Sequence, residues 1–96
     1  MHFNSATLLL ALSSTVLAEY LTAFHASCSP APPAAYNDSL RNWRQRICET
    51  ELKGTYYDDI GQCQVPNPVN ANTKKVYHPS LSASGQPNIE TRCTWS

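Results

Sequence analysis

The chain has 96 residues, and its seven basic and seven acidic side chains give a formal net charge of zero. This length supports one domain at most. Nucleic acid and anionic membrane surfaces attract an excess of Lys and Arg, so the balanced charge argues against both as partners. A single long apolar run, near the N-terminus, leaves the rest of the sequence without a predicted membrane span or lipid-anchor tail.

The first residues predict a secretory signal peptide, residues 1–18. An apolar run ends at Ala18, and no Lys, Arg, Asp or Glu precedes Glu19. The run is too short to cross hydrocarbon about 30 Å thick, which takes about 20 apolar residues. Small side chains at Val16 and Ala18 suit the cleavage site of signal peptidase. We therefore expect a secreted, extracellular mature domain, residues 19–96. The alternative is that the N-terminal segment is not cleaved and forms an apolar helix that packs on the rest of the protein.

The mature chain is expected to begin with a short strand or an arm, residues 19–27, whose apolar side chains include Leu21 and Phe24. Residues 29–35 follow, with three prolines in four positions. Proline fixes φ and lacks an N–H donor, so this segment is predicted to be an exposed, extended connector. A polyproline ligand motif is the alternative interpretation of the same residues.

A helix is predicted to begin near Ser39 and to end at Gly54. Asn37, Asp38 and Ser39 each carry a side chain that can cap free N–H groups, and glycine is common just after a helix. The segment Asn37-Asp38-Ser39 is also the only N-x-[ST] sequon, which makes Asn37 a candidate glycosylation site. Side chains then recur at helical spacing and predict one apolar stripe: Leu40, Trp43, Arg44, Ile47 and Cys48.

A β-hairpin is predicted after the helix. Residues 55–57 are rich in side chains that favour strands, and residues 58–61 resemble a turn in which Gly61 adopts a positive φ. Cys63 and Val65 then alternate with glutamines, as in a strand with one buried face.

The last third of the chain is predicted to hold a long polar loop, residues 67–88, with a short edge strand at residues 76–78. Loops of this length in compact domains are usually functional or mobile. Residues 89–95 alternate in polarity and predict a half-buried antiparallel strand, whose inward side chains are Ile89, Thr91, Cys93 and Trp95. The expected fold is α+β: a small disulfide-stapled domain in which one helix packs on an antiparallel sheet of three to four strands.

Four cysteines, all after Ala18, predict two disulfides, because an even number in a small secreted chain is typical of a disulfide framework. None belongs to a C-x-x-C pair, which argues against a zinc site or a redox motif. Three pairings are open. We prefer Cys28 with Cys93, which joins the two ends of the mature chain. Cys48 with Cys63 then ties the helix to the next strand.

Acid–base chemistry is suggested by one set of side chains, comparable to those that small secreted ribonucleases place on a sheet face: His25, His78, Glu90 and Arg92. Their spacing does not force them together. The chain lacks the nucleophile elbow of a serine hydrolase and the alternating acidic loop of a calcium site. We therefore predict no enzymatic activity, no metal site and no cofactor.

With these features the chain resembles the small cysteine-rich secreted proteins of filamentous fungi, many of which are candidate effectors of plant infection. The resemblance lies in residues 1–18, the four cysteines, the proline-rich start, the polar loop and the terminal segment Cys93–Ser96. It covers the whole chain as a style of sequence and assigns no functional residue. It implies a non-enzymatic virulence factor that binds a host protein or glycan, or shields fungal material, outside host cells or after entry into them.

We expect the protein to act as a monomer, and the residues leave three other functions open. A disulfide-rich toxin or antimicrobial protein fits the cysteines, although membrane-lytic peptides are normally cationic. A hydrolase inhibitor would present residues 67–88 as its bait loop. A ribonuclease-like enzyme would use the two histidines named above.

Overall fold

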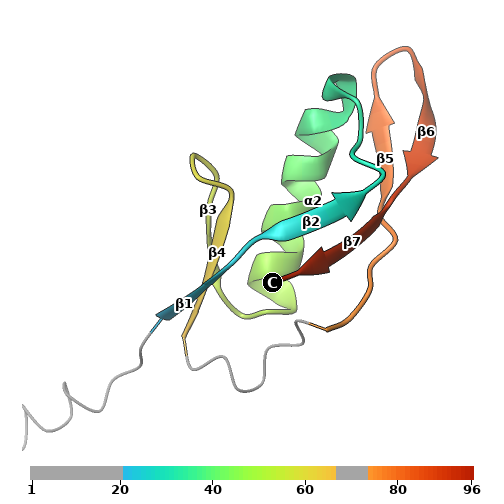
Figure 1. Ribbon diagram of the computed structural model, residues 1–96. Coiled ribbons are helices and arrows are strands. Elements are labelled where there is room, and N and C mark those ends of the chain that lie inside the picture. The colour runs from blue at the N-terminus through green and yellow to red at the C-terminus, as the bar shows by residue number, and fades with distance from the viewer. Residues whose placement is uncertain (1–20, 67–73) are drawn as a thin grey trace, which may run out of the picture.

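The computed structural model describes residues 21–66 and 74–96. The expected signal peptide, residues 1–18, lies outside the described residues. In chain order the described elements are β1 (Leu21–Phe24), β2 (Ala26–Ser29), the 3-10 turn η1 (Ala34–Tyr36), α2 (Asn37–Thr50), β3 (Thr55–Tyr57), β4 (Gln62–Pro66), β5 (Ser80–Ala83), β6 (Gln86–Glu90) and β7 (Arg92–Trp95). One helix with antiparallel strands confirms the predicted α+β class (Figure 1).

The described strands form three small antiparallel sheets in place of the single sheet that we expected. The strand orders are β1-β4-β3, β2-β7 and β5-β6. β1 and β2 belong to one extended ribbon, in which His25 exchanges backbone hydrogen bonds of 2.8 and 2.9 Å with Ser96. The first part of this ribbon pairs with β4 and the second part with β7. Tyr77 adds an isolated bridge to Cys93 of β7.

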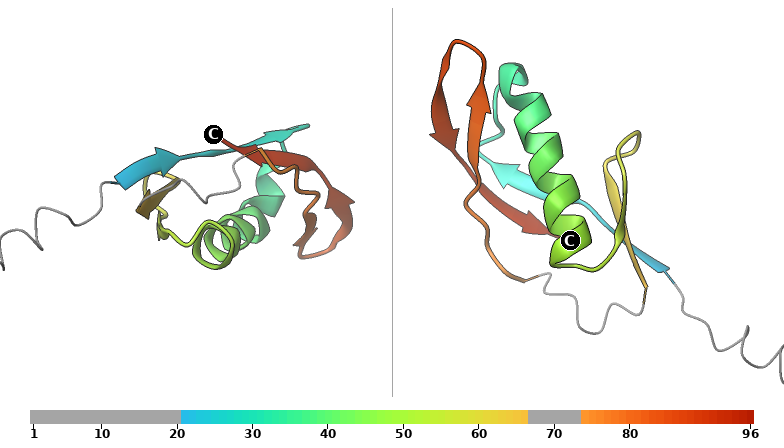
Figure 2. Two further views of the ribbon diagram at one scale, coloured as in Figure 1. Left: turned by 90° about the horizontal axis from the view of Figure 1, so that it is seen from below. Right: turned by 180° about the vertical axis from the view of Figure 1, so that it is seen from behind.

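The three sheets surround the helix on three sides (Figure 2). Seen nearly along the helix axis, β2 and β7 lie over one face of α2, while the β3–β4 and β5–β6 hairpins run along its two flanks. The apolar stripe of the helix turns toward the strands, because burying that stripe is what favours the packed arrangement. The predicted stripe is confirmed for its apolar members, which are buried: Leu40, Trp43, Ile47 and Cys48. Arg44, which we also expected on this stripe, is only half-buried.

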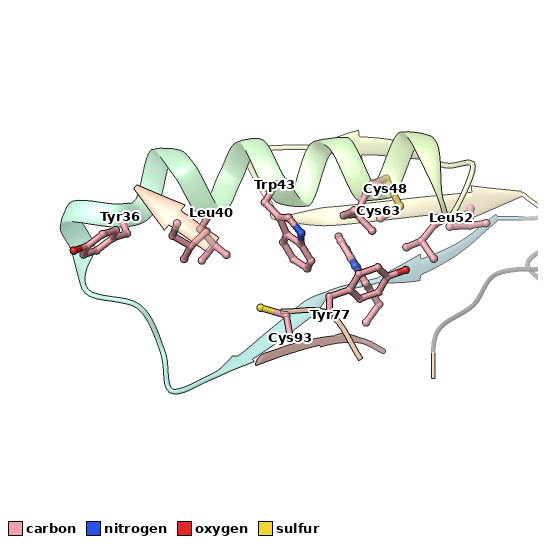
Figure 3. Close-up of a cluster of buried hydrophobic side chains, with 12 residues drawn as sticks. Tyr36, Leu40, Trp43, Cys48, Leu52, Cys63, Tyr77 and Cys93 are labelled. Carbon is pink, nitrogen blue, oxygen red and sulfur yellow. A yellow bond between two sulfur atoms is a disulfide. The ribbon is translucent and has the colours of Figure 1, made fainter. Parts of the chain in front are cut away.

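The core is centred on Trp43 (Figure 3). Its ring stacks on Trp95 with centroids 6.2 Å apart, and it meets Tyr77 edge to face at 5.6 Å. Aromatic pairs of this kind stabilise a protein by about 0.5–1.5 kcal/mol beyond the burial of their area. Because one ring comes from α2 and the other two from the C-terminal segments, the cluster holds the helix against the end of the chain.

All four cysteines form disulfides. The bond between Cys28 and Cys93 joins directly paired residues of β2 and β7. The bond between Cys48 and Cys63 connects the last turn of α2 to β4. The two bonds thus attach the N-terminal ribbon to the C-terminal strand and the helix to the hairpin that follows it. This is the pairing that we prefer from the sequence.

The start of the helix differs from our prediction. α2 begins at Asn37, directly after η1, and Tyr36 before it makes no side-chain capping hydrogen bond. Ser39 lies within the first turn, where its Oγ accepts a hydrogen bond from the backbone N–H of Ser82 (3.0 Å). The hydroxyl thus fastens β5 to the helix. A 3-10 turn supplies the entry to the helix that a polar cap would otherwise provide.

The end of the helix also differs. α2 ends at Thr50, and the residue with a left-handed backbone is Lys53 (φ 61°), not Gly54. Gly54 donates its N–H to the Cys48 carbonyl (2.9 Å) and lies so close to β4 that a Cβ there would be 2.8 Å from Cys63 Sγ. This glycine is therefore required by close packing rather than by helix termination.

The hairpin predicted after the helix is confirmed. β3 pairs with β4, with Tyr56 opposite Cys63. Cys63 and Val65 are buried, as their alternation with glutamines predicts, and Gly61 closes the turn with a φ of 64°. The edge strand expected at residues 76–78 is reduced to the single bridge of Tyr77.

The long polar loop predicted at residues 67–88 is wrong for its later part, while residues 67–73 lie outside the described residues. β5 and most of β6 form a hairpin there, closed by a turn in which Gly85 has a φ of 72°. These strands consist largely of serine, glutamine, proline and asparagine, and in β5 only Leu81 is fully buried. The composition therefore favours a loop although the backbone is paired.

The strand predicted at residues 89–95 is divided at Thr91 between two sheets. β6 pairs with β5, and β7 pairs with β2. Thr91 is buried, and its Oγ1 donates a hydrogen bond to the Pro30 carbonyl (2.7 Å), which satisfies the hydroxyl where the chain changes sheets. The predicted inward face is nonetheless correct, because Cys93 and Trp95 are also buried.

Candidate functional site

A groove of about 760 Å³ lies between α2 and β5. The helix forms one wall, and β5 with the turn after it forms the other. Seven polar residues line these two walls: Asp38, Ser39, Asn42 and Arg46 from the helix, and Ser80, Ser82 and Ser84 from the strand and turn.

The helix wall is a single row of polar side chains. Asp38, Asn42 and Arg46 repeat every four residues, and residues at this spacing lie on one face of a helix. Each step of four residues advances about 6 Å along the helix axis. The row therefore presents a carboxylate, an amide and a guanidinium group in line along the groove.

The strand wall is a row of hydroxyl groups. Ser80 and Ser82 lie two residues apart on one side of β5, a step of about 6.6–6.8 Å, and Ser84 follows in the turn directly after the strand. Leu81 between them points to the core and is 1% exposed. Burial of this leucine fixes which side of β5 faces outward, and it is the reason why the serines line the groove.

One hydrogen bond fixes the position of the strand row relative to the helix row. The backbone N–H of Ser82 donates to Ser39 Oγ, which lies on the helix beside the polar row. β5 runs opposite to α2 (Figure 1), so Asp38 lies toward the Ser84 end of the groove and Arg46 toward the other end. Because the steps of the helix row and the strand row are similar in length, the groove offers hydrogen-bonding groups at regular intervals on both walls.

The two ends of the groove differ in charge. Asp38 Oδ1 lies 3.3 Å from Arg41 Nη2, so the carboxylate is already paired with a cation. Arg46 has no carboxylate within 4 Å among residues 21–66 and 74–96. A guanidinium group binds carboxylates and phosphates through two parallel hydrogen bonds. The Arg46 end of the groove is therefore suited to an anionic group of a ligand.

The structure separates the two histidines that we considered for acid–base chemistry. The antiparallel bridge at Cys93 places His78 beside Arg92 on the exposed face of the strand. His25 lies four residues along the N-terminal ribbon from Ser29, the partner of Arg92, which corresponds to about 13 Å. One histidine thus has a cationic neighbour, and the other lies in the middle of the N-terminal ribbon, between β1 and β2.

The remaining residues of that set do not build a site either. Glu90 belongs to β6 and faces Ser80 across the hairpin. Neither histidine nor Arg92 lines the groove. Within the described ranges no group of three or more His, Cys, Asp or Glu side chains is placed to hold a metal ion. In the same part of the chain, no helix has the length and apolarity needed to cross a membrane.

Asn37 is exposed at the first residue of α2. A helix turns about 100° per residue, which places Asn37 about 140° around the axis from Asn42 of the groove wall. A glycan on Asn37 would therefore project from a different face of the molecule and leave the groove open.

The groove was not foreseen from the sequence, although both of its walls have a sequence signal. The alternation of serine with Leu81 and Ala83 has the period of a strand. The repeat of Asp38, Asn42 and Arg46 lies on the polar side of the predicted helix, where most side chains only meet solvent. What makes these signals a site is the position of β5 beside α2, which no local pattern predicts.

The chain matches no protein-family model, and no curated protein or solved structure is significantly similar to it. The function is therefore inferred from the groove, the disulfide framework and the sequence.

Proposed function

We propose that the protein is a secreted, non-enzymatic effector that binds a host protein or glycan through the groove between α2 and β5. The observation that carries the proposal is the presence of two regular polar rows on facing walls of one groove. A small number of well-placed polar groups is what gives a binding site its specificity. Among the described residues, the groove side chains of Asn42, Arg46 and Ser82 form no ion pair or side-chain hydrogen bond, which leaves them available to a ligand.

Secretion is supported by the apolar segment at residues 1–18 and by the two disulfides. Disulfides persist in oxidising surroundings and are rare where thiols are kept reduced. A small domain held by such bonds is suited to the extracellular space of a host, and entry into host cells would expose both bonds to reduction. We therefore place the binding step outside host cells first.

The distance between His25 and His78 supports a binding role over a ribonuclease-like activity. General acid–base catalysis needs two groups within hydrogen-bond reach of the same substrate. His25 is offset by about 13 Å, along the N-terminal ribbon, from the strand position beside His78, so the two histidines do not meet this requirement. RNA hydrolysis by the secreted protein, abolished in a His78→Ala variant, would contradict the non-enzymatic part of the proposal.

The test compares two variants of one helix. Asn42→Leu replaces a groove amide by an apolar group of similar size, and Gln45→Leu makes a comparable change at an exposed position that does not line the groove. The full chain is expressed for secretion, and its binding to host cell-wall glycans and to purified extracellular host proteins is measured. The N-terminus of the secreted protein is sequenced in the same experiment.

We expect secretion with cleavage after Ala18 and specific binding of one host component. Asn42→Leu should weaken that binding about tenfold, the equivalent of about 1.4 kcal/mol, because two hydrogen-bonding groups are lost from the groove. Gln45→Leu should bind like the parent protein. Retention inside the producing cell would overturn secretion, and equal binding by both variants would overturn the groove as the site.

A further inference from the structure

We propose that the groove between α2 and β5 holds a linear oligosaccharide whose sugars carry carboxylate groups, with one carboxylate bound by Arg46. This inference rests on the proposed function, because it names the ligand class of the same groove. It is carried by the chemistry of the two walls, by the hydrogen bond at the edge of β5, by the spacing of the rows and by the charge at one end.

The chemistry of the walls matches that of a sugar chain. A serine hydroxyl donates one hydrogen bond and accepts two, and the Asn42 amide also does both. Sugar hydroxyls have the same double capacity, so each of them finds a partner whichever way its proton points. Helical and proline-rich peptides that bind in grooves instead rely on apolar pockets. Trp43 is the one large apolar side chain of the lining, and it is only 5% exposed, so the groove offers little apolar surface.

The edge of β5 is not free for a peptide strand. Strand addition requires unpaired N–H and C=O groups along an exposed edge. The N–H of Ser82, at the middle of β5, already donates to Ser39 Oγ (3.0 Å). α2 also lies along this edge (Figure 1). A peptide could therefore not continue the β5–β6 sheet without displacing the helix, which favours a ligand bound by side chains.

The spacing of the rows favours a linear ligand of several units. The three positions on the helix wall extend over about 12 Å, in two steps of about 6 Å. On the facing wall, Ser80 and Ser82 are about 6.6–6.8 Å apart along β5, and Ser84 lies beyond them in the turn. A single sugar cannot contact both Asp38 and Arg46 at the two ends. A short, extended chain of sugars repeats its hydroxyl groups along its length and meets the polar groups of both walls in turn.

The charge distribution then selects the acidic class of sugars. Arg46 is a cation without a carboxylate partner in the described part of the chain, while Asp38 at the other end is paired with Arg41. A carboxylate on the ligand would meet the Arg46 guanidinium in the two-bond geometry that this group favours. A neutral sugar chain would leave this interaction unmade.

The test uses one sugar chain in two charge states. The full chain is expressed for secretion, and the secreted protein is titrated with a short oligogalacturonate and with its methyl ester, which keeps the sugars but removes the negative charges. Binding is followed by NMR, so that the perturbed residues are identified together with the affinity. Arg46→Gln removes the charge from the groove, and Arg92→Gln removes a charge from β7, outside it.

We expect the acid to perturb the groove residues and to bind about tenfold more tightly than the ester, because the ester lacks the pairing with Arg46. Arg46→Gln should weaken binding of the acid by a similar factor and leave binding of the ester unchanged. Arg92→Gln should bind both like the parent protein. The preference for the acid should shrink as the salt concentration rises.

The possible failures are distinguishable. Equal binding of acid and ester, or an unchanged affinity in Arg46→Gln, overturns the assignment of acidic sugars but leaves the groove as a binding site. Perturbation of residues outside the groove by both sugars overturns the site itself. A third outcome is that neither sugar binds, while the parent protein binds a host protein and Asn42→Leu does not. In that case the ligand class is wrong and the proposed function stands.

Discussion

Tyr77 Oη lies 3.0 Å from Glu51 Oε1 and donates a hydrogen bond to it. The same carboxylate oxygen is 3.2 Å from Lys75 Nζ, and this ammonium group lies 5.0 Å from the centre of the Tyr77 ring. Burial and the hydrogen bond to Glu51 raise the pKa of Tyr77 to about 12. Hydrogen bonds from Lys75 and Tyr77 lower the pKa of Glu51. The three side chains thus couple the end of α2 to the segment that pairs with β7.

The raised pKa of Tyr77 predicts a loss of stability at alkaline pH. Because the folded protein binds this proton more tightly than the unfolded chain does, the stabilisation is complete below pH 10 and is lost as the pH rises toward 12. We expect the free energy of unfolding of the parent protein to fall relative to that of Tyr77→Phe over this range. Urea unfolding of both proteins at several pH values measures the difference, and a constant difference from pH 9 to 12 would contradict the prediction.

The lowered pKa of Glu51 predicts the opposite dependence in acid. A carboxyl group whose folded pKa is depressed adds stability above its ordinary pKa of 4.5, and this contribution is lost as the pH falls through the folded value. The parent protein should therefore lose its advantage over Glu51→Gln below about pH 4.5. Glu49→Gln, an exposed change on the same helix, serves as the control and should show a smaller dependence. If the free energies of unfolding of the parent and of Glu51→Gln fell in parallel as the pH is lowered, the coupling of Glu51 to Lys75 and Tyr77 would be contradicted.

Two tyrosines, one buried (Tyr36) and one half-buried (Tyr56), should respond differently to loss of their hydroxyl groups. Tyr36 Oη donates to the Pro87 carbonyl (2.6 Å), whereas Tyr56 Oη is buried with no hydrogen-bond partner among the described residues. We expect Tyr36→Phe to lower the free energy of unfolding by about 1 kcal/mol, the usual net value of a hydrogen bond. Tyr56→Phe should be neutral or stabilising, because it removes a desolvated hydroxyl. Urea unfolding measures both variants. Equal losses of unfolding free energy would contradict the different hydrogen bonding of the two hydroxyl groups.

The elements that the sequence predicts correctly are those whose signal is local. The apolar spacing of α2 identifies its buried stripe without reference to any other segment. The hairpin that ends in Cys63 and Val65 carries both a strand pattern and a turn glycine, Gly61. The inward face of the last strand follows from simple alternation, and this remains true although the chain changes sheets at Thr91.

The elements that the sequence does not predict depend on distant partners. β5 and β6 are polar strands, and what holds β5 in place is the burial of Leu81 and the hydrogen bond from Ser82 to Ser39, 43 positions earlier. Ser39 also illustrates how a residue suited to capping is used otherwise when a strand needs an acceptor. The groove depends on the same long-range contact, so its two walls can be recognised only after the fold is known.

Gly54 is predicted to tolerate no side chain. An added Cβ would lie 2.6 Å from the Gln64 carbonyl oxygen and 2.8 Å from Cys63 Sγ, and both atoms belong to a paired strand that cannot move aside easily. We expect Gly54→Ala to lower the free energy of unfolding by about 3 kcal/mol, as overpacking does in cores. Gly85→Ala is the control: its φ of 72° adds strain of about 1–2 kcal/mol, but the new Cβ meets no atom within 4 Å. A smaller loss in Gly54→Ala than in Gly85→Ala would contradict the close approach.

The two disulfides should differ in how they restrain the unfolded chain. Cys28 and Cys93 are 65 positions apart, and Cys48 and Cys63 are 15 apart. Loop-closure entropy then predicts losses of about 4 kcal/mol for the Cys28→Ala/Cys93→Ala variant and about 3 kcal/mol for the Cys48→Ala/Cys63→Ala variant.

The denaturant dependence separates this entropic effect from loss of packing. Opening the longer loop lets the unfolded chain expand more, so Cys28→Ala/Cys93→Ala should show the larger increase in the m-value of urea unfolding. Loss of packing around Cys48 and Cys63, both fully buried, would lower stability without raising the m-value to the same extent. An unchanged m-value in the Cys28→Ala/Cys93→Ala variant would mean that this bond acts on the folded state and not on the unfolded one.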